Sequence, residues 1–176
     1  MAVPEAAQGI TAVVVTYNPD PEQLARLCQA VQPQVEHIVL VDNGSSAETL
    51  AALQALVEGP SSALTLLAQG ENRGIGAAQN AGITLARERG SRYVLLLDHD
   101  SIPEADMVAT LRAAIENQPA GSPPVAAAGP RYADARQTTN PSPFVQLEGF
   151  KRVRCECQHA GQLIEVEHLI ASGSLI

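Results

Sequence analysis

The apolar residues of this chain follow two alternating patterns over its first two thirds. Short continuous apolar runs are typical of strands buried on both faces of a parallel sheet. They cover residues 10–16, 37–41, 63–68 and 93–97. Each run is followed by a segment with apolar residues every three or four positions, typical of an amphipathic helix. These segments cover residues 21–32, 46–58, 75–89 and 103–117. The order predicts an α/β fold with a mostly parallel sheet, right-handed crossovers and flanking helices.

Turn and capping residues set the expected ends of these helices. Asp20 is the predicted N-cap of the first helix, with Pro21 at its first position. Ser45 and Ser101 are the predicted N-caps of the second and fourth helices, because a glutamate three residues later completes a capping box in each case. The third helix is predicted to close at Gly90.

The pattern changes in the last third of the chain. Residues 125–129 predict one further buried strand, and residues 130–143 form a polar, proline-containing excursion. Residues 151–157 and 163–169 then alternate apolar and polar positions around an Ala-Gly pair, which predicts two antiparallel strands. Their outer charges are expected to pair across the strands: Arg152 and Arg154 with Glu165 and Glu167.

Composition bounds the number of domains and the class of partner. At 176 residues the chain can bury one core, so one domain is predicted after a flexible segment at residues 1–9. A net charge of −8 and a single lysine, Lys151, argue against nucleic-acid binding. Three cysteines without zinc-type spacing, Cys28, Cys155 and Cys157, predict reduced core thiols. The absence of a signal-peptide pattern and of an apolar run of ~18 residues predicts a cytoplasmic chain.

Two carboxylates stand at the carboxyl end of the fourth apolar run, where open α/β sheets bind their ligands. Residues i and i+2 of an extended segment point the same way, so Asp98 and Asp100 can reach one cation. Mg²⁺ or Mn²⁺ carrying phosphates is the predicted ion, since it needs only one or two carboxylates besides phosphate and water oxygens. The alternative is a polar strand end that only caps the next helix, and His99 is expected to face the sheet.

The third helix begins in a segment rich in glycine and alanine, residues 69–82. Small residues allow a close backbone approach, either to the sheet or to a ligand. In the second case the N–H groups at the helix start, together with Arg73, would bind a pyrophosphate. Gly74 and Gly76 do not form a dinucleotide fingerprint, because that motif follows the first strand and has a third glycine where Asn80 stands.

Parallel strands end at one edge of a sheet, so the polar residues that follow them are expected to meet there. A nucleoside diphosphate would fit such an edge. Tyr17 can stack on a base, and Asp42 can accept a hydrogen bond from a pyrimidine N–H. Arg73 can oppose phosphate charge, while the acid pair holds a cation between the phosphates. The residues predicted to converge are Tyr17, Asn18, Asp42, Asn72, Arg73, Asp98 and Asp100.

Four motifs carry a resemblance to a known family. They are residues 14–19 (VVTYNP), 41–45 (VDNGS), 71–82 (ENRGIGAAQNAG) and 97–101 (LDHDS). In this order and spacing they resemble the inverting glycosyltransferases of the GT-A fold, glycosyltransferase family 2. Within that family the chain is most similar to bacterial rhamnosyltransferases that use dTDP-L-rhamnose, although His99 stands where a glutamine is expected in that subset.

The resemblance implies a GT-A Rossmann-like domain over residues 10–176, with a nucleotide-binding half at 10–118, the start of an acceptor-side half at 125–176 and a C-terminal antiparallel hairpin. It implies a nucleotide-sugar donor, dTDP-rhamnose or a UDP-sugar, and a glycan acceptor, either a polysaccharide or a lipid-linked glycan. The implied cofactor is Mg²⁺ or Mn²⁺, held by Asp98 and Asp100. The implied donor-binding residues are Thr16, Tyr17, Asn18, Asp42, Asn72, Arg73, Asn80 and Asp98.

The general base of the family lies beyond the segment that residues 171–176 resemble, where this chain ends. We therefore expect a C-terminally truncated domain that binds a nucleoside diphosphate and transfers sugar poorly, and we assign no catalytic residue. The implied reaction is a single displacement at the anomeric carbon, in a full-length protein at the inner face of the membrane. Two alternatives stay open. One is a sugar-1-phosphate nucleotidyltransferase, whose basic glycine-rich loop is missing here, and the other is a non-catalytic nucleotide-sugar-binding module.

Overall fold

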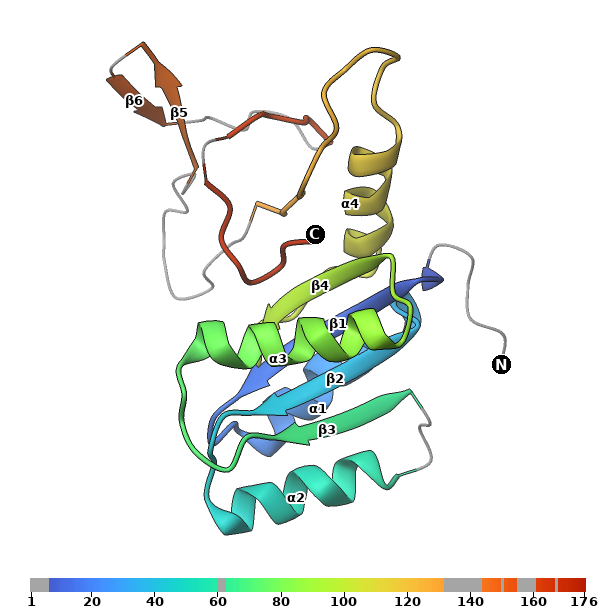
Figure 1. The fold of residues 1–176 in the computed structure, drawn as a ribbon, viewed down its shortest axis with the longest axis vertical. Coiled ribbons are helices and arrows are strands. Elements are labelled where there is room, and N and C mark those ends of the chain that lie inside the picture. The colour runs from blue at the N-terminus through green and yellow to red at the C-terminus, as the bar shows by residue number, and fades with distance from the viewer. Residues whose placement is uncertain (1–6, 60–62, 132–143, 150, 155–160, 167) are drawn as a thin grey trace.

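The centre of the fold is a four-stranded parallel sheet (Figure 1). The structure, a computed structural model, describes residues 7–59, 63–131, 144–149, 151–154, 161–166 and 168–176. The strand order is β3-β2-β1-β4, for strands β1 (Ile10–Thr16), β2 (His37–Asp42), β3 (Leu64–Ala68) and β4 (Tyr93–Asp98). The four apolar runs and their parallel arrangement are therefore confirmed.

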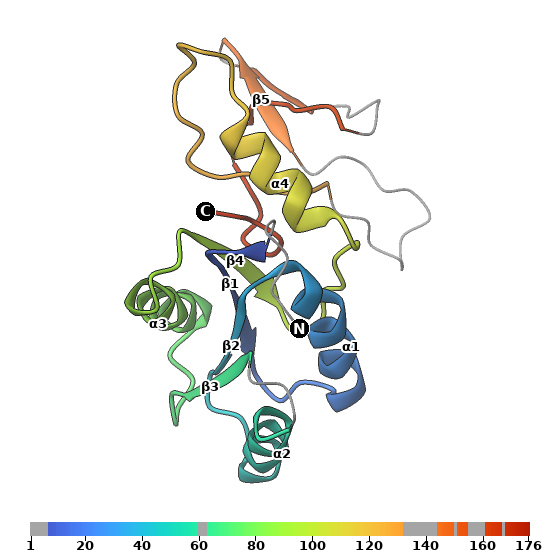
Figure 2. The same ribbon diagram turned by 90° about the vertical axis from the view of Figure 1, so that its right-hand side faces the viewer.

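Helices cover both faces of this sheet (Figure 2). They are α1 (Pro21–Val31), α2 (Ala47–Val57), α3 (Ile75–Glu88) and α4 (Met107–Glu116), with a short 3-10 helix, η2 (Gln32–Gln34). Because side chains alternate along a strand, Ala12 and Val14 of β1 enter the core shared with α1, α2 and α4. Val13 and Val15 enter the core on the opposite face, beneath α3. Burial on both faces explains why β1, β2 and β4 read as continuous apolar runs, whereas most of β3, at the side of the sheet, is only half-buried.

Helix α3 packs closely on β1 and β2. Gly82 permits this, because a Cβ atom there would lie 2.3 Å from Cγ1 of Val13 and 3.0 Å from Cγ2 of Val41. Of the two interpretations of the small residues in this segment, close packing on the sheet is thus confirmed for Gly82. The helix start differs, since a Cβ atom at Gly74 or Gly76 would meet no heavy atom of the described residues within 4 Å.

The helix starts agree with the sequence for α1 and differ for α2. Asp20 caps α1 as predicted, and its Oδ1 accepts from N of Gln23 at 2.8 Å. Helix α2 is capped by Ser46, whose Oγ accepts from the backbone N–H three residues on at 3.2 Å, and the predicted cap at Ser45 is wrong. The Ser45 hydroxyl bonds to the carboxylate of Asp42, a stronger acceptor than a neutral group.

Helix α4 begins at Met107, later than predicted, and Ser101 is not its N-cap. Gln34 explains the late start. Its Nε2 donates to O of Glu104 at 2.9 Å, and its Oε1 accepts from N of Val108 at 3.1 Å. These two bonds hold the turn before the helix against η2. A side chain from a distant segment thus satisfies a backbone N–H that an N-cap would otherwise bond.

The hairpin in the last third of the chain pairs differently from the prediction. Strand β6 (Lys151–Arg154) pairs with β5 (Val145–Glu148) and not with residues 163–169, whose described part is no strand. Gly149, at φ +64, allows a tight turn between β5 and β6. Closing this short loop costs less conformational entropy than closing a longer one, which favours this pairing. The predicted strand partner of the arginines is therefore wrong: Arg152 lies opposite Leu147 and Arg154 opposite Val145.

The predicted strand at residues 125–129 is also absent, and only Ala128 forms a bridge, to Leu175. Leu175 also bridges to Leu95 on its other side. N of Leu96 donates to O of Ser174 at 2.9 Å, and residues 173–176 run antiparallel beside β4. This segment, which the sequence did not indicate as a strand, covers the edge of β4.

The remaining expectations concern the chain's start and its thiols. Ala7 is buried, and N of Gly9 donates to Oε2 of Glu36 at 2.6 Å, so residues 7–9 contact the rest of the fold. Cys28 is a free buried thiol as predicted, and burial raises its pKa to about 11. The described residues contain no helix long and apolar enough to span a membrane. Residues 1–6, most of the polar excursion, Glu167 and two cysteines lie outside the described residues: Cys155 and Cys157.

Candidate functional site

The residues predicted to converge lie along one edge of the sheet, where four parallel strands end (Figure 1). In the register of the sheet, Thr16 lies opposite Asp42, which lies opposite Ala68. On the other side of β1, Asp98 lies opposite Val15. The edge therefore presents the loops after β3, β2, β1 and β4 in that order. This is the arrangement that the sequence predicted.

Asp42 anchors the loop that follows β2. It is only 2% exposed. Its Oδ2 accepts from N of Gly44 at 3.2 Å and from N of Ser45 at 3.0 Å, while its Oδ1 accepts from the hydroxyls of Ser45 and Thr16, the latter at 3.4 Å. A carboxylate bonded in this way holds its own loop in one conformation. A ligand N–H that bonds Asp42 must therefore displace one of these donors.

Tyr17 and Asn18 lie in the loop after β1, and Tyr17 is 49% exposed. Asn18 has φ +44, a left-handed conformation that asparagine tolerates. Its N–H donates to Oγ of Ser45 at 2.8 Å, and its Oδ1 accepts from N of Ser46 at 2.9 Å, at the start of α2. Asn18 thus joins the loops after β1 and β2, and its position fixes that of the exposed Tyr17.

Asn72 and Arg73 lie in the loop between β3 and α3. Oδ1 of Asn72 accepts from N of Gly74 at 3.0 Å, which forms a turn before the helix. The guanidinium of Arg73 lies 3.0 Å from Oε1 of Glu71, and both side chains are exposed. An exposed ion pair of this kind contributes little free energy, so Arg73 can exchange Glu71 for a phosphate at little cost.

Helix α3 presents an uncapped start to the same edge. Gly74, at φ +84, precedes the helix, and no described side chain caps its first N–H groups. Residues 75–77 are exposed. Asn80 is exposed further along the helix, where its backbone O accepts from the hydroxyl of Thr84 at 2.9 Å. A helix start of this kind attracts anions, because its N–H groups carry partial positive charge.

The two aspartates of the predicted metal motif follow β4. Burial, together with the charge of Asp100, raises the pKa of Asp98, whereas Asp100 is exposed. N of Asp98 donates to Oγ of Ser172 at 3.0 Å. Oγ of Ser172 also lies 2.9 Å from Oγ of Ser101, so a residue from the end of the chain holds the turn that carries both acids.

This pair of acids fits a hard divalent cation. A cation between the two carboxylates would remove the repulsion that contributes to the raised pKa of Asp98. The described residues contain no group of three or more His, Cys, Asp or Glu side chains that could hold a metal. Mg²⁺ and Mn²⁺ do not need one, because water and phosphate oxygens complete their coordination. His99 faces the sheet as predicted, with Nδ1 3.3 Å from O of Val15.

Three residues that shape this edge were not predicted: Asn43, Ser45 in its bond to Asp42, and Ser172. Asn43 and Ser45 stand in the motif at residues 41–45, so their place in that motif could have indicated a role at this edge. Ser172 lies 74 residues from Asp98 along the chain. Nothing local in the sequence indicates that contact.

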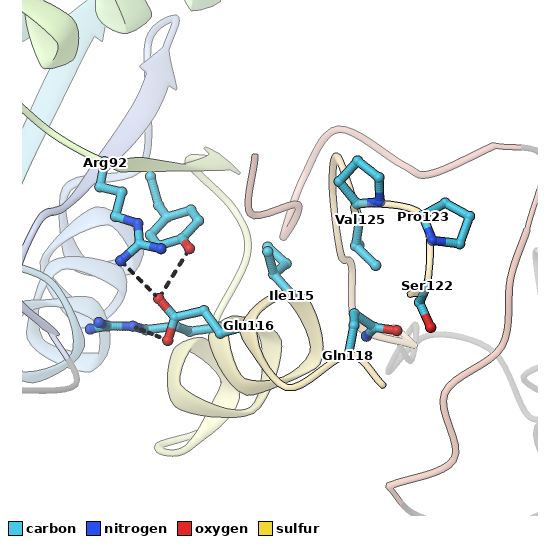
Figure 3. Close-up of a pocket in the computed structure, with 10 residues that line it drawn as sticks. Arg92, Ile115, Glu116, Gln118, Ser122, Pro123 and Val125 are labelled. Atoms are coloured by element: carbon cyan, nitrogen blue, oxygen red, sulfur yellow. Dashed lines mark hydrogen bonds and ion pairs between the residues drawn. The ribbon is translucent and has the colours of Figure 1, made fainter. Parts of the chain in front are cut away.

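A cavity of about 450 Å³ lies at the opposite end of β4 (Figure 3). Glu116 forms one side of it, where its Oε1 accepts from the Tyr93 hydroxyl at 3.0 Å and lies 3.4 Å from the Arg92 guanidinium. Its Oε2 accepts from Nε of Arg112 at 3.1 Å. Pro123 and its neighbours form the facing wall. None of the predicted site residues lines this cavity, so it is separate from the candidate site.

A parallel sheet of this order, with helices on both faces, defines an α/β domain of the GT-A type. The chain belongs to glycosyl transferase family 2, whose sequence profile matches residues 11–159. This confirms the fold class and the family that the four motifs indicated. It also decides against the nucleotidyltransferase alternative.

The similar proteins include a dTDP-rhamnosyl transferase, RfbF of Shigella flexneri. It is 33% identical over 109 residues, which are 62% of this chain and 35% of that protein, so the chain spans about a third of its length. The crystal structure of GalNAc-T7 with UDP, GalNAc and Mn²⁺ has a TM-score of 0.53 at 20% identity, over 64% of this chain and 22% of that one. It supports the fold alone. A structure of TarS from S. aureus gives a TM-score of 0.48 at 23% identity, over 61% of this chain and 32% of that one.

Proposed function

We propose that this domain binds a nucleoside diphosphate-sugar at the carboxyl edge of its sheet, and that it forms the donor side of a rhamnosyltransferase. The observation that carries the proposal is the convergence at this edge of an exposed aromatic ring, an uncapped helix start with an arginine, and a pair of acids. Three of the large apolar side chains that are exposed lie on segments leaving this edge: Tyr17, Ile75 and Ile102. Exposed apolar side chains next to polar ones are typical of a binding site.

Each part of the donor has a partner at this edge. The Tyr17 ring stacks on the base, while Asp42 accepts from the pyrimidine N3–H. The second contact requires the Ser45 hydroxyl to turn away, since the Asp42 carboxylate is buried and already bonded. Arg73 and the start of α3 bind the diphosphate. Thr16, Asn18, Asn72 and Asn80 complete the proposed donor site, with Asn18 acting through the loops that it joins.

Asp98 and Asp100 would hold Mg²⁺ or Mn²⁺, which supplies positive charge to the departing diphosphate. In the proposed reaction an acceptor hydroxyl attacks the anomeric carbon from the face opposite the diphosphate. The new bond joins that carbon to the acceptor oxygen, the bond to the diphosphate oxygen breaks, and the hydroxyl proton passes to a base. We assign that base to none of the described residues.

The choice of sugar rests on the similarity to RfbF, a dTDP-rhamnosyl transferase. We propose dTDP-L-rhamnose as the donor and a UDP-sugar as the second candidate, with a polysaccharide or a lipid-linked glycan as the acceptor. Calorimetric titration of the protein with dTDP and with UDP, each with and without Mn²⁺, tests the donor site. Tighter binding of dTDP in Mn²⁺ supports the proposal, whereas no binding of either nucleotide, or binding that ignores the metal, contradicts it.

A non-catalytic nucleotide-sugar-binding module remains the second candidate, because it would use the same edge. The two functions differ in the fate of the sugar. Transfer of rhamnose from dTDP-rhamnose to an added glycan, followed by mass spectrometry of the glycan, supports the transferase. Binding of the intact donor without transfer by the full-length protein favours the module.

A further inference from the structure

Asn43 is a buried polar residue at the centre of the carboxyl edge, with an exposed fraction of 5%. Its backbone N–H donates to O of Thr16 at 2.8 Å, at the end of β1. Its Oδ1 accepts from N of Arg73 at 2.9 Å, and its Nδ2 donates to Oδ1 of Asn72 at 3.1 Å. One residue thereby joins the ends of β1 and β2 to the loop that follows β3.

The next residue brings the same two loops into direct contact. Gly44 has φ +87, and a Cβ atom there would lie 2.5 Å from N of Asn72 and 2.5 Å from C of Glu71. Only glycine fits this close approach. The loop after β2 therefore lies directly against the backbone that carries Arg73, and the Asn43 carboxamide holds it there.

The bonds of Asn72 extend this arrangement to the start of α3. Its Oδ1 accepts from Nδ2 of Asn43 and also from N of Gly74 at 3.0 Å. Asn43 thus fixes the backbone on both sides of Arg73, while the Arg73 side chain stays exposed beside Glu71. Because buried Asn43 cannot reach a ligand itself, any effect that it has on one must pass through this loop.

We propose that Asn43 is the positioning residue for the diphosphate half of the donor site. It holds Arg73 and the first N–H groups of α3 in place before a nucleotide binds, so that binding does not have to order this loop. This inference rests on the proposed function for its ligand, a nucleoside diphosphate. The base half of the site depends on Tyr17 and Asp42, so loss of the Asn43 side chain should weaken phosphate binding selectively.

Two variants and one control test the proposal. Asn43→Ala removes both side-chain bonds, whereas Asn43→Asp keeps an acceptor for N of Arg73 and removes the donor to Asn72. The control is Thr11→Val, which removes a side-chain bond of 2.7 Å to Oγ of Ser91. Thr11 is 2% exposed and lies near the start of β1, at the opposite edge of the sheet.

The first measurement needs no nucleotide. Amide hydrogen exchange of Arg73 should accelerate at least about tenfold in Asn43→Ala, because the amide loses its hydrogen-bond acceptor. Exchange of Gly74 should also accelerate, because its acceptor, Oδ1 of Asn72, is no longer held by Nδ2 of Asn43. In Asn43→Asp the Arg73 amide should stay protected. Thr11→Val should leave both amides as in the wild type. If both amides keep their protection in Asn43→Ala, Asn43 does not hold this loop and the proposal is wrong.

The second measurement compares the dissociation constants of dTDP and thymidine. In Asn43→Ala the value for dTDP should rise about five- to twentyfold, the scale of losing hydrogen bonds that orient a charged group. The value for thymidine should change less than about twofold. Equal weakening of both ligands contradicts the proposal. A wild-type protein that binds neither dTDP nor UDP refutes the proposed function and the ligand role with it, and the exchange experiment then decides separately whether Asn43 holds the loop.

Discussion

Replacing Gly82 by alanine should destabilise the fold by pushing α3 away from the sheet. The new Cβ atom would lie 2.3 Å from Cγ1 of Val13, and 3.0 Å from its Cγ2 and from Cγ2 of Val41. Val13 and Val41 are completely buried and cannot turn aside. Since carbon atoms pack at roughly 3.5–4.0 Å, the helix must shift by about 1 Å at this point.

The size of the effect follows from two opposing contributions. Overpacking of a well-packed core costs about 1–3 kcal/mol, and this contact lies at the upper end because the clash is direct. Alanine in place of glycine inside a helix stabilises the helix by about 1 kcal/mol. The expected net loss is about 1–2 kcal/mol, which lowers the melting temperature by roughly 2–8 °C in a domain of this size.

A second glycine of the same helix supplies the matched control. A Cβ atom at Gly76 would meet no described heavy atom within 4 Å, so Gly76→Ala should gain up to about 1 kcal/mol from helix propensity without a clash. Urea unfolding followed by circular dichroism measures both variants. The same substitution on one helix is therefore expected to have opposite signs at Gly82 and Gly76.

A double-mutant cycle tests whether the clash with Val13 is the cause. Val13→Ala removes both γ-carbon atoms that the new Cβ would meet, so the Gly82→Ala change should cost less in that background by about 1 kcal/mol or more. Strict additivity of the two changes would contradict the steric explanation. A Gly82→Ala protein as stable as the wild type would refute it altogether.

Three further predictions concern charge and burial. Asp100→Asn should abolish the effect of Mn²⁺ on dTDP binding, so titration in Mn²⁺ should return the metal-free affinity of the wild type; a retained metal effect would contradict its role as a ligand. The hydrogen bond from Arg112, then that from Tyr93, lowers the pKa of Glu116 below its ordinary 4.5. Its contribution to stability is therefore complete above pH 4.5 and is lost as the pH falls through the lower folded value. Urea unfolding across this acid range should show a smaller decline for Glu116→Gln than for the wild type, and equal declines would count against the ion pairs. Cys28, with a pKa of about 11, should resist iodoacetamide in the native protein and react in urea, as peptide mass spectrometry can show.

The sequence predicted those features that depend on a local pattern of residues. Strands β1, β2 and β4 could be predicted because they are buried on both faces, which makes each of them a continuous apolar run. The convergence of Tyr17, Asp42, Arg73 and the acid pair also followed, since parallel strands must end at the same edge. These inferences needed only chain order and periodicity.

Some features could not be predicted because they depend on contacts between distant segments. Gln34 sets the start of α4 through bonds to residues 70 and 74 positions away, and no local pattern marks a glutamine for this task. Ser172 reaches Asp98 across 74 residues in the same way. The Ser45 hydroxyl could either cap α2 or donate to the carboxylate of Asp42. It donates to Asp42, because a hydrogen bond to a charged acceptor is stronger.

The bonds between loops divide the carboxyl edge into two parts that can be perturbed separately. Asn18 joins the loops after β1 and β2, and Asn43 joins those after β2 and β3, so the proposed base and phosphate contacts belong to one connected network. The turn with the two acids is held differently, by Ser172 and by a bond of 3.1 Å from Nε2 of Gln23 to O of Asp100. A substitution at Asn43 should therefore leave the acid pair in place. Loss of metal dependence in that variant would contradict this separation.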